Sequence, residues 1–573
     1  MTIPTTLAEG KAIRQYVPVD FRLTDWASVA PYFNELKERA IDSVSDLESW
    51  LRDRSELESF IGEESRWRYI RTTVDTLDKE AEKALEFYYS EIQPRLETAN
   101  FELNRKLVEC PFLSDLDKEK YFVFLREIRN DINLYREENL PLFTELSIKQ
   151  NEYGAIVGKM SIEYNGQVLT LPQASNLLKE NDRSLRETIY RKVNSRRLED
   201  KDQLDELFDH LLQLRQKVAA NAGFENYRDY KFAAMGRFDY TPADCESFQQ
   251  AVASEVKPLV AVLNEQRRKA LGVDTLRPWD MEVDLKAAVP LHPFDNGQQL
   301  AERSIACLDQ LDPFFSECLR IMQRLGRLDL DSRIGKAPGG YNMSMPETGV
   351  PFVFMNAASS DRDVKTMVHE MGHAVHSFLS HELELEGFKN YPSEVAELAS
   401  MSMEQFTMDY WNVFYPEQEQ LVRSKKNQLE GIIKILPWIA TIDKFQHWLY
   451  LHQGHTPDER NQAFVRIYDE FHPSVDFSGL EQEKAYMWQK QLHLYEVPFY
   501  YIEYGMAQLG AVAMWKQYKE SPKQAIENYK AALQMGYTRP IGEIYERAGI
   551  SFRFDRDYIR ELMQFLKREY EAL

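Results

Sequence analysis

The stretch "KTMVHEMGHAVHSF", residues 365–378, decides how the chain is interpreted. His369 and His373 lie four residues apart, so on a helix both imidazoles share one face and can reach one cation. Glu370 is offset by about 100° and can reach a water at that metal without being a ligand. The surrounding helix is apolar, with Val364, Met367, Val368, Met371, Val375 and Phe378. Two buried histidines beside a buried glutamate are costly unless paired or metallated, so the motif predicts a metal centre rather than an ordinary core helix.

A catalytic zinc takes three protein ligands and keeps one position open, so a third ligand is needed. His376 lies on the same helix, too far round for tetrahedral closure, and we interpret it as a supporting or core residue. The HExxHxxGxxH class needs Gly at 376 and His at 379, where this chain has His376 and Leu379. That class is therefore excluded.

Carboxylates for the third position follow in "NYPSEVAELASMSMEQF", residues 390–406, where Glu394, Glu397 and Glu404 lie near one face of a predicted helix. A carboxylate within the apolar run "VAELASMSM" is costly unless something positive compensates it, which favours Glu397 as the ligand. Glu394 is the alternative. If it is not a ligand, we expect Glu394 to accept a hydrogen bond from a ligand histidine.

A glycine-rich loop and a predicted strand precede the metal helix in "GKAPGGYNMSMPETGVPFVFMN", residues 335–356. "VPFVFMN" is typical of a short buried strand, whose edge could pair with an extended peptide. Gly339 and Gly340 would let a peptide backbone approach closely, although a plain loop is the alternative. We take Gly339, Gly340, Tyr341 and Phe354 as candidate substrate-binding residues.

Helical periodicity covers most of the remaining chain, from about 25 to 150 and again from about 173. Between these regions, "KMSIEYNGQVLTL", residues 159–171, alternates around Asn165-Gly166 and predicts a hairpin. We predict a mainly α fold of two closely packed lobes. The N-terminal helical lobe would span 1–200 with the hairpin, and the catalytic helical lobe with the metal site would span 201–573.

The composition excludes several classes of function for these 573 residues. A net charge of −22 and a pI near 5.1 argue against nucleic acid as the main partner. Four cysteines without CxxC pairs predict reduced core thiols. The N-terminus does not resemble a secretory signal, and there is no apolar run of 18 residues, so we expect a cytoplasmic protein with no membrane partner.

The segment "HLYEVPFYYIEYGMAQ", residues 493–508, offers a further group of polar aromatic side chains. Pro498 can start a helix on which Tyr501 and Tyr504 share a face, three residues apart. These phenols could serve the reaction, or they could be an aromatic stripe in the core. The residues alone do not separate these interpretations.

Together these motifs resemble the oligoendopeptidase F and thimet oligopeptidase family of zinc metallopeptidases. The resemblance rests on "HEMGHAVH", on "ELASMSME" starting 28 residues after the first histidine, and on the glycine-rich and tyrosine-rich segments quoted above. "LPWIATIDKFQHWLY" and "LLQLRQKVAANAGFENYRDY" support it. It covers residues 205–550 and implies helical lobes around a deep channel that admits short peptides.

The resemblance also implies roles for individual residues. Glu397 would be the third ligand of one zinc ion per chain, with His369 and His373. His493, Tyr501 and Tyr504 would bind the substrate and its transition state. The spacing there is one residue shorter than in the thimet branch, so Tyr500 is the alternative to Tyr501.

We therefore predict a zinc endopeptidase that hydrolyses internal bonds of short peptides, with Glu370 as general base. Tyr504 is the leading oxyanion donor, followed by His493 and Tyr501. Two alternatives are a zinc carboxypeptidase and a non-catalytic helical peptide-binding protein in which the metal only stiffens the site. Cleavage of an end-blocked peptide separates the endopeptidase from the carboxypeptidase, and hydrolysis of a quenched peptide that a chelator abolishes would exclude the non-catalytic protein.

Overall fold

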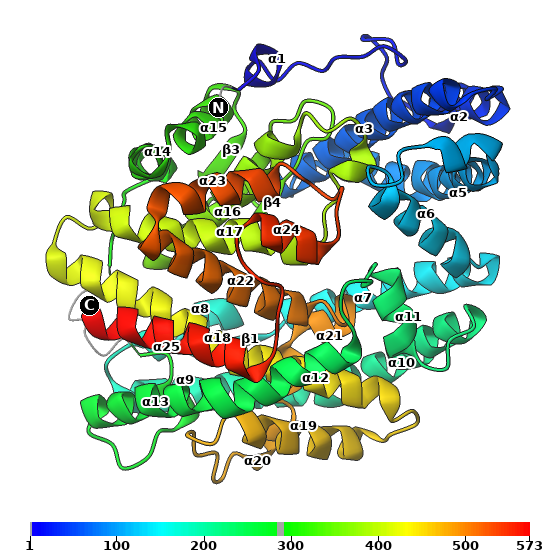
Figure 1. Cartoon of the computed structure of the whole chain (residues 1–573). Helices are drawn as coiled ribbons and strands as arrows, with labels where there is room; N and C mark the ends of the chain where they lie inside the picture. The colour runs from blue at the N-terminus through cyan, green and yellow to red at the C-terminus, as the bar shows by residue number, and fades with distance from the viewer. Residues whose placement is uncertain (1–2, 284–290) are drawn as a thin grey trace. The chain divides into compact units, whose positions relative to one another are not determined.

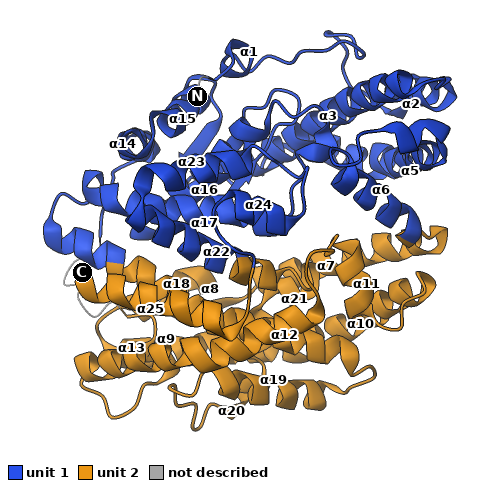
Figure 2. Cartoon of the chain, viewed as in Figure 1, with its two compact units in different colours: residues 1–133, 290–425, 507–552 blue, residues 134–289, 426–506, 553–573 orange. Residues whose placement is uncertain are grey.

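The computed structural model of the chain describes residues 3–283 and 291–573. Helices dominate these residues, with two small sheets, which confirms the predicted mainly α fold (Figure 1). The chain divides into two compact units, each assembled from three segments. Unit 1 comprises residues 1–133, 290–425 and 507–552, and unit 2 comprises 134–289, 426–506 and 553–573 (Figure 2). The division into consecutive lobes at residue 200 stays a prediction.

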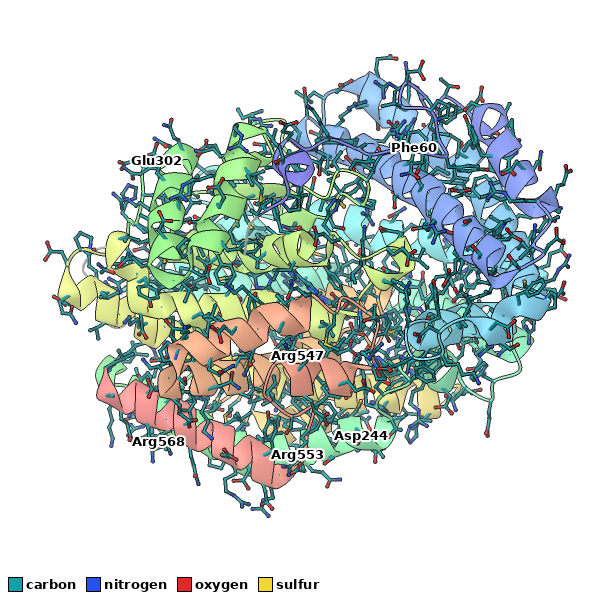
Figure 3. The ribbon with its side chains drawn as sticks, turned by 45° about the horizontal axis from the view of Figure 1, so that its top comes forward. Phe60, Asp244, Glu302, Arg547, Arg553 and Arg568 are labelled. Carbon is teal, nitrogen blue, oxygen red and sulfur yellow. The ribbon has the colours of Figure 1, made fainter. Side chains whose placement is uncertain are left out.

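Unit 1 contains an N-terminal group of helices with a core of its own. Asp25 and Ser43 accept hydrogen bonds from first-turn backbone N–H groups and so start two of these helices. Trp50 and Phe60, the latter labelled in Figure 3, belong to their buried cluster. The helices of this group are α1 (Thr5–Ala8), α2 (Trp26–Glu38), α3 (Val44–Val74), α4 (Lys79–Phe87), α5 (Gln93–Glu109) and α6 (Phe122–Leu134).

The rest of unit 1 combines a three-stranded sheet with further helices. Strand β5 (Phe352–Ala357) is central, parallel to β3 (Leu328–Asp331) and antiparallel to β4 (Tyr341–Met343). Both β4 and β5 contact α16. The helices are α14 (Gly297–Leu311), α15 (Pro313–Arg324), α16 (Asp361–Ser380), α17 (Ser393–Thr407), α23 (Pro522–Leu533) and α24 (Ile541–Arg547). The strand predicted at "VPFVFMN" is thus confirmed, beside the helix that carries the histidine motif.

The position of β5 corrects one expectation about peptide binding. We expected the edge of "PFVFMN" to pair with a substrate, but both edges of β5 are already paired. Its four residues from Phe352 to Met355 are buried. A central strand is covered on both faces, so its sequence is a continuous apolar run. Among the described residues, no strand pairs with the outer edge of β4, the edge that faces away from β5.

The described residues of unit 2 are helical apart from one hairpin. Its interior stacks aromatic rings, with Tyr153 and Tyr495 centred 4.2 Å apart and Trp488 parallel to Tyr495 at 5.9 Å. Two helices, α18 (Gln418–Leu451) and α22 (Tyr501–Glu520), begin in one unit and end in the other. The other helices are α7 (Leu140–Gly158), α8 (Leu171–Asn176), α9 (Arg183–Glu199), α10 (Lys201–Asn221), α11 (Tyr227–Ala234), α12 (Pro242–Ala251), α13 (Lys257–Leu271), α19 (Pro457–Phe471), α20 (Glu481–Ala485), α21 (Leu492–Glu496) and α25 (Arg556–Ala572).

The hairpin of unit 2 pairs β1 (Ser161–Tyr164) with β2 (Gln167–Thr170), as the alternation of 159–171 predicts. Asn165 and Gly166 both have positive φ, 52° and 74°, which is the backbone that a two-residue hairpin turn needs. Asn and Gly are the residues that adopt this conformation at least cost.

Candidate metal centre

Helix α16 is fixed at its start by a capping box between Ser360 and Asp363. Its apolar residues Val364, Met367 and Val368 are fully buried, and their burial fixes which face of the helix points into the core of unit 1. His369 and His373 then lie on the partly exposed side of the helix. The sequence motif therefore presents both imidazoles together, as predicted from their spacing.

Helix α17 approaches α16 very closely at Gly372. A Cβ at Gly372 would lie 2.4 Å from the Cα of Ser400 and 2.6 Å from the carbonyl oxygen of Ala399. Only glycine allows such contact between the two backbones. Figure 1 shows the two helices side by side, and this approach brings the carboxylate of Glu397 to the histidines.

The side chains of His369, His373 and Glu397 form one cluster. Glu397 Oε2 lies 3.4 Å from His369 Nε2 and 3.9 Å from His373 Nε2. The three ligand atoms all lie within 4.8 Å of one another, and the two imidazole rings are nearly perpendicular. Two imidazoles and one carboxylate that converge in this way can hold one divalent ion.

Hydrogen bonds behind the cluster orient its members. The Nδ1 atom of His369 is 2.7 Å from Glu404 Oε1, His373 has a backbone hydrogen bond to Ala396, and Ser400 Oγ donates to Glu397 Oε2. These contacts leave the two Nε2 atoms directed at the cluster. Supporting bonds of this kind are typical of metal-ligating histidines, and the nitrogen and oxygen donor set suits zinc. The residues present therefore fit the metal.

The charges around the cluster favour a cation. Burial lowers the pKa of His369, but the hydrogen bond that His369 donates to Glu404 and the charges of Glu404, Glu397 and Glu370 outweigh burial and raise the pKa to about 9. Burial also raises the pKa of Glu397. Positive charge is thus strongly stabilised at this place, and a metal ion would supply it.

Glu370 lies on the same helix, next to the ligand His369. Its carboxyl group is buried, and burial, together with Glu397 and Glu404, raises its pKa to about 7 although His369 acts in the opposite direction. Asn342 of β4 donates to the backbone oxygen of Glu370 at 3.0 Å and fastens the sheet to this point of the helix. A carboxyl group in this environment can take up and release a proton near neutrality.

Glu404 is the supporting residue that sequence reasoning missed. We expected Glu394 to bond a ligand histidine, but the bond to His369 comes from Glu404. Glu404 follows Glu397 by seven residues, two helical turns, so both carboxylates lie on the same face of α17. Glu394 is buried and its backbone oxygen accepts a bond from Tyr545, while the role expected for its side chain stays a prediction.

His376 lies outside the ligand cluster. Its ring is fully buried and stacks on Tyr391, with centroids 3.5 Å apart and planes 13° from parallel. Within residues 3–283 and 291–573, neither ring nitrogen has a hydrogen-bond partner. Burial lowers the pKa of His376 to about 3, so the ring is neutral and packs as an aromatic core residue.

The four candidate substrate-binding residues lie on β4, β5 and the loop before them. Tyr341 and Phe354 are register partners whose rings stack at 4.9 Å, and the Tyr341 hydroxyl is 2.6 Å from Thr73 Oγ1. Gly339 has a φ of 99°, and a Cβ at Gly340 would lie 3.2 Å from the Phe354 carbonyl oxygen. The positive φ favours glycine at 339, a Cβ at 340 would make a tight contact, and contact of either residue with a peptide stays a prediction.

In unit 2, the structure brings His493 together with three tyrosines. Ring centroids lie 4.7 Å from His493 for Tyr501, 6.0 Å for Tyr504 and 6.2 Å for Tyr500, and both Tyr500 and Tyr501 contact Tyr504. Helix α22 begins at Tyr501, so Tyr501 and Tyr504 lie on its first turn. All four aromatic residues, including the alternative Tyr500, form one group.

Protonation of this aromatic group is set by burial and by Gln491. Trp438 Nε1 can only donate, and it donates to Gln491 Oε1, so the amide nitrogen of Gln491 faces His493 Nδ1 at 2.6 Å. The proton of the neutral ring is then on Nε2. Burial lowers the pKa of His493 to about 4 and raises that of Tyr501 to about 12, so both are neutral hydrogen-bond donors at pH 7.

Two family models match the chain. "Peptidase family M3" matches residues 176–564, and "Peptidase M3 N-terminal domain" matches residues 17–135. The chain belongs to peptidase family M3. The match includes the metal cluster, Glu370 and the aromatic group, and it confirms the resemblance to oligoendopeptidase F.

Relatives in the M3 family are distant in sequence and close in fold. Oligoendopeptidase F from Lactococcus lactis subsp. cremoris is 21% identical over 71% of this chain and 66% of its own length, and oligopeptidase PepF from Bacillus subtilis is 22% identical over 50% and 42%. A solved structure of PZ peptidase A with an inhibitor is 25% identical, covers 97% of this chain and 99% of its own, and has a TM-score of 0.89. The chain thus spans just under two thirds of the first relative's length.

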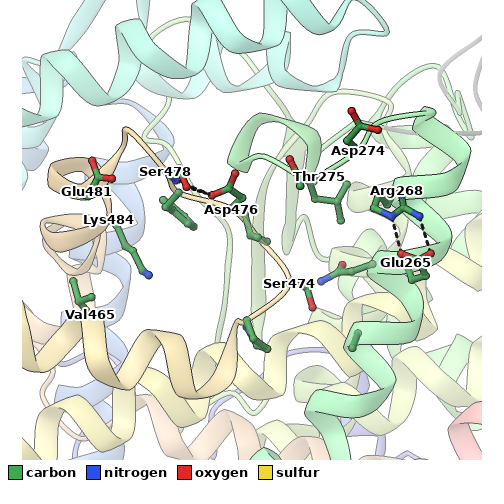
Figure 4. Close-up of a pocket in the computed structure, with 16 residues that line it drawn as sticks. Glu265, Arg268, Asp274, Thr275, Val465, Ser474, Asp476, Ser478, Glu481 and Lys484 are labelled. Carbon is green, nitrogen blue, oxygen red and sulfur yellow. Dashed lines mark hydrogen bonds and ion pairs between the residues drawn. The ribbon is translucent and has the colours of Figure 1, made fainter.

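The pocket in Figure 4 is lined by residues other than those of the metal cluster and the aromatic group. Its volume is about 740 Å³, and it lies in unit 2 between α13 and the loop that follows α19. Glu265 pairs with Arg268 on one side, and Asp476 bonds Ser478 on the other. None of its lining residues is a candidate site residue.

No described helix is both long and apolar enough to cross a membrane.

Proposed function

We propose that this M3 protein is a zinc-dependent endopeptidase that hydrolyses internal bonds of short peptides. The observation that carries the proposal is the cluster of His369, His373 and Glu397, with Glu370 beside it on the same helix. A cluster of this composition matches the ligand set of catalytic zinc, and an adjacent carboxyl group matches a general base.

We assign the metal to those three side chains, with Glu404 orienting His369. When bound, zinc supplies Lewis-acid chemistry, lowering the pKa of water and stabilising negative charge. The protein contributes the fixed direction of the two Nε2 atoms and of Glu397 Oε2, which Ala396, Ser400 and Glu404 hold from behind.

Glu370 carries the proton. Its carboxylate takes a proton from water as the oxygen attacks the peptide carbonyl carbon, and it then delivers that proton to the departing amine nitrogen. The C–N bond breaks as the nitrogen becomes a neutral leaving group. A pKa raised by burial toward neutrality suits both steps, because the same group must accept and release a proton at the same pH.

Neutral donors in the aromatic group would stabilise charge on the substrate oxygen. Tyr504 leads, followed by His493 through its Nε2 proton and by Tyr501, with Tyr500 as the alternative. Burial keeps His493 and Tyr501 neutral, so these two would donate hydrogen bonds without adding a charge. A donor directed at a developing oxyanion strengthens as the charge grows.

Short peptides are the proposed substrate class. The names of the Lactococcus and Bacillus relatives, oligoendopeptidase F and oligopeptidase PepF, support it. The open edge of β4, close to Gly339 and Gly340, offers main-chain hydrogen bonds that are independent of the peptide's side chains. Tyr341 would line this edge, with the buried Phe354 ring stacked behind it, and a deep channel would exclude folded proteins.

The test uses internally quenched peptides of graded length with both ends blocked. We expect cleavage at internal bonds, loss of cleavage after the metal is removed with a chelator, and recovery on addition of zinc. A second set of peptides has a free carboxyl end. A carboxypeptidase would cleave only this second set, and a binding protein would cleave neither the blocked nor the unblocked peptides. Cleavage that continues at full rate after complete metal removal would refute the proposal.

A further inference from the structure

A second group of metal-binding side chains lies in unit 2. Cys245 is on α12, just after Asp244, which Figure 3 labels, and Asp443 and His447 are on α18. Asp443 and His447 are four residues apart, so both side chains leave one face of their helix toward α12. The three ligand atoms lie within 4.8 Å of one another, as close as those of the first cluster.

All three side chains are removed from solvent. Relative exposure is 0% for Cys245, 0% for Asp443 and 6% for His447. Within the described ranges of the chain, both ring nitrogens of His447 and the Oδ1 atom of Asp443 lack a hydrogen-bond partner. Buried polar atoms without partners are costly and rare, so these three atoms call for a ligand.

An ordinary ion pair between Asp443 and His447 does not satisfy these atoms. The separation between Asp443 Oδ2 and His447 Nε2 is 3.5 Å, and no hydrogen bond forms between them. Asp443 Oδ2 already accepts a bond from the Gln249 amide at 2.7 Å, which holds the carboxylate from the side and leaves Oδ1 available. An orienting bond to one oxygen, with the other oxygen open, is typical of a carboxylate ligand.

We propose that Cys245, Asp443 and His447 bind a second divalent ion, zinc by donor type, with a structural role. Thiolate, carboxylate and neutral imidazole together carry two negative charges, which a divalent ion balances to zero in a buried site. The thiol of Cys245 releases its proton to solvent as the ion binds. The Gln249 side chain, on α12 one turn after Cys245, orients Asp443 through its amide N–H.

The ion would fasten α12 to α18. Both helices approach Gly505 of α22 near this point. A Cβ at Gly505 would lie 2.8 Å from the Phe248 ring of α12 and 3.1 Å from Ile439 of α18. The His447 ring also packs edge-on against Phe232 and Phe499, with centroids 6.0 and 5.5 Å away. This second site is independent of peptide hydrolysis, and its ligands are different residues from those of the proposed catalytic site.

The sulfur ligand provides a signal that the first cluster cannot give. The first cluster contains no cysteine, so a thiolate-to-Co²⁺ charge-transfer band in the near ultraviolet reports on the second site alone. We would strip the full-length protein of metal, titrate it with Co²⁺, and count bound metal by mass spectrometry. Wild-type protein should bind two ions per chain and show the band.

Three variants distinguish the sites. Cys245→Ser should lose the band and one equivalent of Co²⁺, whereas His373→Ala should lose one equivalent and keep the band. Cys110→Ser is the control for a cysteine elsewhere in the chain and should change neither. The absence of the band in folded wild-type protein, or a band that survives Cys245→Ser, would overturn the proposal.

X-ray absorption on zinc-loaded wild-type protein tests the proposal without any variant. We expect a sulfur shell at about 2.3 Å, because that is the usual zinc–thiolate distance. Its amplitude should correspond to one sulfur shared over two zinc ions. A spectrum with nitrogen and oxygen scatterers alone would contradict a Cys245 ligand, whatever the behaviour of the variants.

Discussion

Gly372 on α16 and Ser400 on α17 are in direct backbone contact, so close that a single added methyl group would lie 2.4 Å from the Ser400 Cα. This contact brings Glu397 to His369 and His373. The glycine inside "HEMGH" is therefore part of the metal centre, although it provides no ligand atom.

The variant Gly372→Ala tests this dependence. The methyl group must push α17 away, so we expect the free energy of unfolding to fall by about 1–3 kcal/mol and zinc affinity to fall with it. Thermal melting and metal analysis measure the two effects. Gly431→Ala, within α18 where the added Cβ meets nothing within 4 Å, is the matched control and should be neutral or slightly stabilising. Unchanged metal affinity in Gly372→Ala would contradict the proposed role of the contact.

Replacement of Glu370 by Gln removes the proposed proton carrier and keeps the shape of the side chain. We expect kcat to fall by a factor of about 10²–10⁴ or more, while the bound metal stays at its wild-type level. Steady-state kinetics on a quenched peptide and metal analysis of the same sample give both values. Near-normal turnover in a fully metallated Glu370→Gln protein would mean that another group moves the proton.

The supporting role of Glu404 can be compared directly with that of Glu394. Loss of the 2.7 Å contact in Glu404→Ala should weaken zinc binding by about 10- to 100-fold, because His369 loses the group that orients it. Competition titration with a chromophoric chelator measures the affinity. Glu394→Ala should have the smaller effect. The reverse order would restore the role that the sequence suggested for Glu394.

A buried ion pair holds the start of the tyrosine segment. Arg237 bonds both the Glu503 carboxylate, at 2.8 Å, and the backbone oxygen of Phe499, which has a φ of 68°. Glu503→Gln removes the negative charge that faces Arg237 in this buried pair, so we expect a loss of about 3–5 kcal/mol in the free energy of unfolding. Chemical denaturation measures it.

The exposed pair of Glu265 and Arg268 provides the comparison for that loss. Glu265→Gln should leave the free energy of unfolding nearly unchanged, because an exposed pair is screened by water. Equal losses in Glu265→Gln and Glu503→Gln would mean that burial of the Arg237 pair contributes nothing.

Sequence reasoning succeeded where a local pattern has one physical explanation. The spacing of His369 and His373 places them on one helix face whatever the tertiary structure, and alternation around Asn165 and Gly166 requires a hairpin. Glu397 was favoured because a carboxylate in an apolar run needs a positive partner, and its carboxylate lies beside both histidines, while its role as a ligand stays a prediction. In each case the energetic cost of the residue type indicated the structure around it.

What the sequence could not predict depends on contacts between distant segments. The central position of β5 depends on which strands pair with it, and a buried strand reads the same at the centre or beside an edge. Glu404 and Glu394 are both acidic residues on one predicted helix, and only packing selects the one that reaches His369. The meeting of Cys245 with Asp443 and His447 joins residues almost 200 positions apart.

The most direct test of the central claim is a paired measurement of zinc content and peptide cleavage in wild-type protein and in Glu397→Ala. If His369, His373 and Glu397 hold the catalytic zinc, Glu397→Ala should contain one equivalent less than wild type and cleave an end-blocked peptide at a rate lower by orders of magnitude. A folded Glu397→Ala protein with wild-type zinc content and wild-type cleavage would contradict the account.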